Sequence, residues 1–182
     1  MKTLIASDIH GSATHAEKLV RRIEEEAPDR IALLGDILYH GPRNPLPDGY
    51  DPQAVVALLA PLSTRIVAVR GNCDAEVDQM VLPFPCMETY AQVIDSTADV
   101  TLFLTHGHAI SPENPPALPP RTVFCSGHTH VKALEAREGA LFCNPGSTSL
   151  PKDGSRSYAV YEDGVVALRL LDDGSTLSTL SV

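Results

Sequence analysis

Three short apolar runs lie in the first 74 residues, and each is followed by polar residues. This pattern predicts strands at 2–8, 30–36 and 65–74. The two stretches between them are amphipathic at the helical period, which predicts helices at 12–29 and 52–62. An order of strand, helix, strand, helix, strand implies right-handed crossovers and a parallel sheet.

The rest of the chain has a different pattern, with short apolar runs separated by Gly, Pro and Asp. We predict strands here and no helix after residue 61. The expected strands are 87–95, 100–108, 121–130, 140–147, 157–163 and 165–173. Proline-rich loops are expected at 39–51 and 111–121. The pattern predicts one mixed α/β domain spanning 1–182, with a βαβαβ half followed by a strand-rich half and two sheets packed together.

Composition supports a single domain and narrows its partners. The 182 residues are 43% hydrophobic and 20% charged, which is enough for a sizeable core. The net charge of −9 disfavours a nucleic-acid groove, which normally carries a basic surface. No apolar run is long enough for a membrane helix, and the N-terminal run is too short for a signal peptide. We therefore expect a cytoplasmic protein without membrane partners, whose four cysteines are reduced and mostly buried.

Polar side chains follow directly on five of the predicted strands. Ligands bind at the carboxyl ends of strands in open α/β sheets, so these clusters are expected to meet. Each is flanked by a glycine, which allows tight turns and close backbone approach. The clusters are Asp8 with His10, Asp36, Asn72, His106 with His108, and His128 with His130.

The residue types in these clusters indicate a metal site. Carboxylate, imidazole and amide ligands together suit Mn²⁺, Fe or Zn²⁺ better than Mg²⁺ or Ca²⁺, which prefer oxygen alone. Bound divalent cations would also reconcile an acidic chain with an anionic substrate. His15 is different, because it lies on the predicted first helix and is expected to be solvated.

The motifs D-x-H, G-D, G-N, H-G-H and G-H-T-H follow in this order between residues 8 and 130. In this order and spacing they resemble the calcineurin-like metallophosphoesterase superfamily. The segments LGDILYHGPRN, VRGNCDAEVDQM, FLTHGH and NPGS are similar to bacterial YfcE-type phosphodiesterases. This resemblance implies an α/β/β/α sandwich, in which two mixed β-sheets are packed together and flanked by helices.

The resemblance also implies a ligand set and a reaction. Asp36 would bridge two divalent metal ions, Mn²⁺ above all, with Fe or Zn²⁺ as alternatives. A water or hydroxide between the ions would attack a phosphodiester, of aryl or nucleotide type. The other ligands would be Asp8, His10 and His130 for the first metal, and Asn72, His106 and His128 for the second.

Asp36 and Asn72 are thus candidate catalytic residues, together with Arg43 and Cys73. Arg43 and Arg70 are candidates for holding phosphate oxygens; Arg43 is preferred as a planar donor, whereas Arg70 ends a strand and could instead form only a salt bridge. Many members of the superfamily have a histidine after G-N that protonates the leaving group, but here the residue is Cys73. A thiol, with an ordinary pKa near 8.5, is a poorer proton donor. Diesters and activated aryl esters are therefore favoured over alkyl monoesters.

Three alternatives to this function remain open at the level of sequence. The chain could be a binding or scaffold module with weak catalysis, although all seven expected ligands are present. It could be a nuclease of the same superfamily, against which the acidic charge argues. It could also be a cyclic-nucleotide phosphodiesterase, which would use the same ligands. A small phosphoester substrate is expected, and formation of a homo-oligomer is left open.

Overall fold

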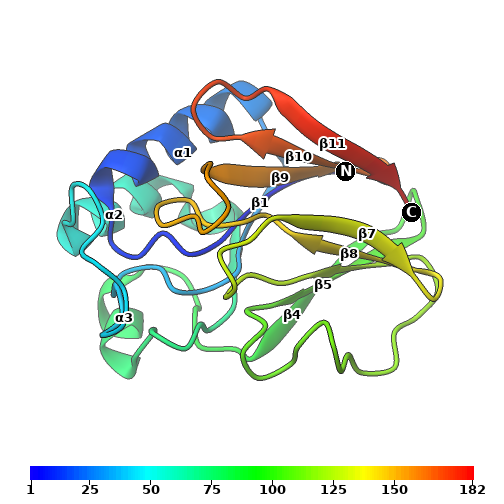
Figure 1. Cartoon of the computed structure of the whole chain (residues 1–182), viewed down its shortest axis with the longest axis horizontal. Helices are drawn as coiled ribbons and strands as arrows, with labels where there is room; N and C mark the ends of the chain where they lie inside the picture. Colours follow the sequence, from blue (N-terminus) through cyan, green and yellow to red (C-terminus); the bar gives the residue numbers. More distant parts are fainter.

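Two β-sheets pack face to face, and two helices cover the outer face of the larger sheet (Figure 1). The computed structural model describes residues 1–182. The helical segments are α1 (Ala13–Glu26), α2 (Pro52–Leu59), the 3₁₀ segment η1 (Ala60–Arg65) and α3 (Glu76–Val81). The strands are β1 (Lys2–Ala6), β2 (Arg30–Leu33), β3 (Ile66–Ala68), β4 (Tyr90–Asp95), β5 (Val100–Thr105), β6 (Thr122–Cys125), β7 (Ala133–Arg137), β8 (Ala140–Asn144), β9 (Ser157–Glu162), β10 (Val165–Leu170) and β11 (Thr176–Ser181).

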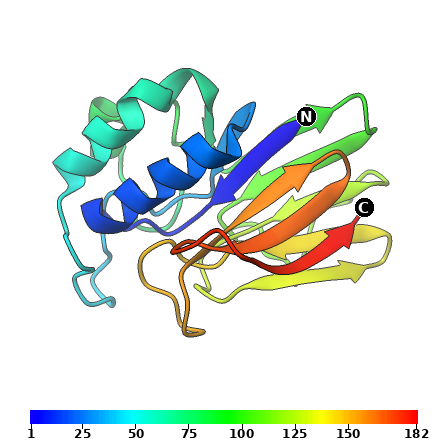
Figure 2. The same cartoon turned by 90° about the horizontal axis from the view of Figure 1, so that it is seen from above.

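Both sheets are mixed. The six-stranded sheet has the order β11-β10-β9-β1-β2-β3, and the five-stranded sheet has the order β4-β5-β6-β8-β7. In the first, β1, β2 and β3 are parallel; in the second, β5, β6 and β8 are parallel. Figure 2 shows the helices on one side of this pair of sheets. The expected fold class, two packed mixed sheets with helices, is therefore confirmed.

Alternating residues of β1 build two separate cores. Leu4 points to the helices and packs in a cluster that includes Leu19 of α1. Its neighbour Ile5 points the other way, into the layer between the sheets, where it packs in a cluster that includes Leu102 and Val123. Burial on both faces explains why this strand reads as a continuous apolar run.

The proline-rich loop 111–121 covers the outer face of the five-stranded sheet. Three stacked or tilted rings, Phe103, Phe124 and Phe142, lie on that face. Leu118 of the loop and Ile110 just before it pack against these rings.

Some expectations about elements were wrong. Helix α3 contradicts the prediction of no helix after residue 61; its six residues are too few to show a clear helical period, and only one of its side chains is buried. Strands β7 and β11 were not predicted because they lie at sheet edges with mostly exposed side chains, and so lack the alternation that marks a half-buried strand.

His15 was expected to be solvated, and this was also wrong. Its side chain is buried, and its Nδ1 lies 2.7 Å from the Oγ of Ser12, the N-cap residue of α1. Burial, reinforced by the positive charges of Arg156 and Lys18, lowers its pKa to about 4. The four cysteines form no disulfide, and all except Cys73 are buried, as expected. None of the helices has the length and apolar character needed to cross a bilayer.

Candidate metal centre

The carboxyl ends of strands from both sheets meet at one place, and the predicted polar clusters lie there. Asp8 follows β1, Asp36 follows β2 and Asn72 follows β3 in the larger sheet. His106 follows β5 directly, and His130 lies in the loop after β6 in the smaller sheet. Residues that are 98 or more positions apart in sequence thus become neighbours, as the sequence predicted.

Asp8, His10 and His130 form a fully buried group. The Oδ1 atom of Asp8 lies 3.2 Å from Nε2 of His130 and 3.6 Å from Nε2 of His10. The two Nε2 atoms are 3.1 Å apart. Burial by itself raises the pKa of Asp8, but hydrogen bonds from His10 and His130, when these rings are protonated, more than offset this and hold that pKa well below its usual range.

A second group surrounds Asp36 and His106. The Oδ2 atom of Asp36 lies 3.5 Å from Nε2 of His106 and 3.7 Å from Nε2 of His10, so this carboxylate faces both groups. The Oδ1 atom of Asn72 lies 3.1 Å from Nε2 of His106. The half-buried ring of His128 packs edge-on against His106, with ring centroids 5.1 Å apart. All seven predicted ligands therefore come together, although their roles as ligands stay a prediction.

Backbone carbonyls fix the orientation of three histidine rings. The Nδ1 atom of His10 lies 2.8 Å from the carbonyl oxygen of Tyr39. The Nδ1 atom of His106 lies 2.6 Å from the carbonyl oxygen of Leu34, and that of His130 lies 2.7 Å from the carbonyl oxygen of Leu150. A carbonyl can only accept, so Nδ1 carries a proton, and in the neutral ring that a metal requires Nε2 presents a lone pair. Such a carbonyl partner is the usual support of a metal-ligating imidazole.

The resulting contacts fit a bound cation. When the rings are neutral with this tautomer, the 3.1 Å contact between His10 and His130 joins two lone pairs, and so does the contact of His106 with the Asn72 oxygen. Oδ1 of Asp8 is buried without a hydrogen-bond partner. Buried acceptors that face one another repel, and a cation between them removes the conflict. This mixed set of nitrogen and oxygen donors suits a divalent metal ion.

The backbone at these residues is also unusual. Five of the ten non-glycine residues with positive φ are predicted ligands. Left-handed backbone is rare for residues with a side chain and concentrates at functional sites. These φ angles are 57° at Asp8, 51° at His10, 53° at Asp36, 68° at His128 and 61° at His130.

Close approach of the loops requires glycine at two positions. A Cβ at Gly71 would collide with the backbone nitrogen and the carboxylate of Asp36. A Cβ at Gly127 would collide with the side chain of Ser7 and come within 2.8 Å of Oδ2 of Asp8. The loops after β3 and β6 therefore reach the carboxylates only because these residues have no side chain.

Asp74 is a supporting residue that the sequence reasoning missed. It is buried, and its carboxylate accepts hydrogen bonds from the backbone N–H groups of Asp36, Ile37 and Gly71 at 2.7–2.9 Å. It thereby ties the loop after β2 to the loop after β3 and positions Asp36. Its place two residues after Asn72 in GNCD was visible, but nothing in the sequence showed that it faces inward.

We expect Asp74→Asn to lower the free energy of unfolding by about 2–3 kcal/mol, because an amide offers one acceptor oxygen and turns an NH₂ group toward N–H donors. Urea denaturation measures this loss. Asp78→Asn is the matched control: Asp78 is also buried, but its carboxylate accepts a single backbone hydrogen bond, from Ala75 at 2.8 Å, which an amide oxygen can keep. Equal losses in the two variants would contradict the positioning role.

The other predicted residues lie around the same opening. Arg43 is exposed and lines a cavity of about 530 Å³, together with Asp36, Asn72 and His128. Lys152, which was not singled out from the sequence, also lines this cavity. Arg70 donates to the Asp74 carbonyl and forms an ion pair with the exposed Glu76, which agrees with the salt-bridge alternative. His108 is exposed, with its ring 5.2 Å from that of His106.

Cys73 lies beside two of the predicted ligands. Its thiol could join His10 and Asp36 in holding an ion, since their ligand atoms lie within 4.8 Å of one another. Its backbone N–H donates to Oδ1 of Asp36 at 2.8 Å. Burial, followed by the charge of Asp36, raises the pKa of the thiol to about 12.

Comparison with known proteins agrees with this geometry. The calcineurin-like phosphoesterase superfamily domain matches residues 1–163. Phosphodiesterase YfcE of Escherichia coli is 42% identical over 100% of this chain and 98% of its own. The probable metallophosphoesterase YsnB of Bacillus subtilis is 27% identical over 94% of this chain and 91% of its own. A solved structure of YfcE, described as a phosphoesterase from E. coli, superposes with a TM-score of 0.96 at 43% identity, over 100% of both chains. The chain therefore belongs to the calcineurin-like phosphoesterase superfamily.

Proposed function

We propose that this protein is a phosphodiesterase that hydrolyses small phosphodiesters with two divalent cations, of which Mn²⁺ fits best. One observation carries the proposal: the buried Nε2 atoms of His10 and His130 and Oδ1 of Asp8 face one another, and with neutral rings none of the three has a donor. The 42% identity to a relative named phosphodiesterase supports the choice of substrate class. The acidic net charge supports a small substrate over a nucleic-acid polymer.

The chain's own residues would divide the work as follows. Asp8, His10 and His130 would hold one cation, Asn72, His106 and His128 the other, and Asp36 both. Bound divalent cations lower the pKa of water and stabilise charge on phosphoryl oxygens. Arg43 and Lys152, on the wall of the same cavity, would donate to the phosphate oxygens and orient the ester.

Hydrolysis of bis(p-nitrophenyl) phosphate by the purified protein with Mn²⁺ tests this function. We expect turnover that is faster on this diester than on p-nitrophenyl phosphate, because no histidine follows Asn72 to protonate a poor leaving group. Binding of Mn²⁺ without turnover of either ester would favour a scaffold role instead. Faster cleavage of cyclic nucleotides would shift the proposal to that class of diester.

Substitution of Cys73 tests how the leaving group departs. We expect Cys73→Ala to change the diester rate by less than about tenfold, because nitrophenolate leaves without a proton. We expect Cys73→His to raise the rate on alkyl monoesters far more than on the diester, since general acid catalysis is worth roughly 10²–10⁴-fold where it is needed. The measurement is kcat/KM for both substrates, with metal content determined in each variant.

Two results would contradict this account of Cys73. A large loss of diesterase activity in a fully metallated Cys73→Ala variant would give the thiol a direct role, which its distance from His10 and Asp36 permits. An equal loss on both substrates in Cys73→His would make Cys73 a packing residue. The space around the Cys73 sulfur is limited, since a Cβ added at Gly41 would lie 2.8 Å from it.

A further inference from the structure

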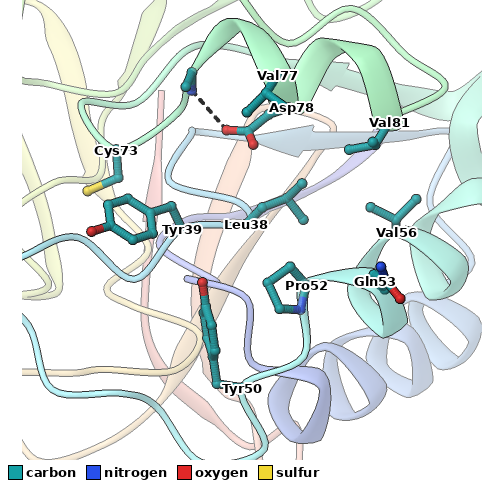
Figure 3. Close-up of a pocket in the computed structure, with 11 residues that line it drawn as sticks. Leu38, Tyr39, Tyr50, Pro52, Gln53, Val56, Cys73, Val77, Asp78 and Val81 are labelled. Carbon is teal, nitrogen blue, oxygen red and sulfur yellow. Dashed lines mark hydrogen bonds between the residues drawn. The ribbon is translucent and has the colours of Figure 1, made fainter.

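An apolar cavity of about 570 Å³ lies beside the metal centre (Figure 3). Its walls come from the loop after β2, from the start of α2 and from α3, and eight of its eleven lining residues are hydrophobic. Binding sites for small organic molecules have similar volumes, about 300–1,000 Å³, and similar walls. Of the residues discussed above for hydrolysis, only Cys73 lines this cavity.

The cavity adjoins the catalytic opening. Cys73 lines both. Tyr39 contributes its ring to the apolar cavity, while its carbonyl oxygen accepts the hydrogen bond that orients His10. Figure 3 shows this ring beside Cys73, with the apolar side chains of α2 and α3 beyond it. A phosphate at the metal centre can therefore carry an organic group that extends past Cys73 into the cavity.

The walls favour a planar apolar group. Tyr39, His40 and Tyr50 form a row of edge-on rings, with centroids 4.8 and 5.2 Å apart. Tyr39 and Val81 are large hydrophobic side chains that are 42% and 51% exposed, and both face this cavity. Exposed apolar side chains that cluster in a concave region, in contrast to single ones scattered over the surface, indicate a binding site. Aromatic rings pack well against other rings.

The walls also disfavour a charged group. No lysine or arginine lines the cavity, and its one charged residue is Asp78. The carboxylate of Asp78 accepts a hydrogen bond from the N–H of Ala75, the N-cap residue of α3, as the dashed line in Figure 3 shows. A substituent with further phosphates would meet no cation here and would be repelled by this carboxylate.

We propose that this cavity is the substrate-specificity subsite and binds an uncharged aryl ester group of the phosphodiester. The inference rests on the proposed function, since it needs a phosphate held at the metal centre. The preference for an aryl over a methyl substituent is determined by four lining residues: Tyr39, Tyr50, Val56 and Val81.

Phosphonates test the subsite without catalysis, because their single organic group is joined by a carbon–phosphorus bond that ester hydrolysis leaves intact. The probes are methylphosphonate and phenylphosphonate, and calorimetry on the Mn²⁺-loaded protein gives their dissociation constants. Because the ring is removed from water, we expect phenylphosphonate to bind about tenfold more tightly or better. Equal affinities, or no binding of phenylphosphonate, would overturn the inference.

Variants on α3 locate the effect. Val81→Trp places a bulky side chain in the part of the cavity next to α3 and should lower the preference for phenylphosphonate over methylphosphonate, measured as the ratio of the two dissociation constants. Met80→Trp is the matched control, since Met80 is the preceding residue, is 83% exposed and does not line the cavity; its ratio should match the wild type. If Val81→Trp does not fold, Val56→Thr provides the test. Threonine has the same shape as valine but carries a hydroxyl in place of one methyl, so this variant should reduce the preference for phenylphosphonate.

The two hypotheses fail in different ways. If phenylphosphonate is preferred and Val81→Trp lowers the preference, but no ester is hydrolysed, the subsite stands and the catalytic function fails. If diesters are hydrolysed while neither Val81→Trp nor Val56→Thr changes the ratio, the function stands and the subsite is wrong.

Discussion

Removal of divalent cations is expected to abolish phosphodiester hydrolysis and to lower the melting temperature by about 5–10 °C. Ions that bind only the folded state add about 2.7 kcal/mol when their concentration is 100 times the dissociation constant. For a chain of this length, each kcal/mol shifts the melting temperature by about 2–4 °C. The physical reason is the group of facing acceptors at Asp8, His10 and His130, which a cation relieves.

Re-addition of single metals to chelated protein measures both effects. We expect Mn²⁺ to restore activity better than Mg²⁺, because imidazole ligands suit Mn²⁺ and Mg²⁺ prefers oxygen. Scanning fluorimetry gives the thermal shift independently of turnover. Full activity of a sample shown by elemental analysis to contain no metal would refute the two-cation proposal.

Asp36→Asn is expected to lower kcat/KM for the diester by more than about 100-fold, while the chain still folds. Loss of a residue that only supports a metal ligand already costs 10–100-fold, and Asp36 faces both groups of ligands. Asparagine keeps an oxygen for the Cys73 N–H and tolerates the left-handed φ of 53° at this position. Its NH₂ group can donate to the ring nitrogens, so the metal-free fold should be at least as stable as before.

Circular dichroism, metal content and kcat/KM are the measurements for this variant. Asp51→Asn is the matched control, because Asp51 caps α2 by accepting from the Ala54 N–H at 3.0 Å, and asparagine is an equally good cap. An Asp36→Asn variant that unfolds, while Asp51→Asn does not, would make Asp36 a structural residue. Retention of full activity would remove it from the catalytic site.

Much of the fold was predictable because buried strands leave a strong pattern. The parallel strands β1, β2 and β3 are buried and read as apolar runs, and the polar clusters after them could be expected to meet. The family motifs then supplied the predicted ligand set. Helix α3 and strands β7 and β11 were missed because most of their side chains are exposed, so tertiary context and not sequence period determines them.

What remained hidden was the inward direction of individual polar residues. Asp74 and His15 look like ordinary turn and helix-surface residues in the sequence, yet both are buried. The hydrogen-bond partners that make their burial tolerable are backbone groups and a cap serine, which carry no sequence signal of their own. The apolar cavity beside Cys73 was likewise invisible, because its walls come from three separate segments.

The left-handed backbone at five predicted ligands bears on how the centre acquires its metal. Each such residue costs about 1 kcal/mol or more, and together they cost an amount comparable to the net stability of a typical domain. The backbone bonds from His10 to Asp36 and from Gly127 to His106 hold these loops in position by protein contacts alone. The conformational cost is therefore met during folding, and metal loading should be a rapid, single-step association that leaves the amide exchange of the flanking strands unchanged.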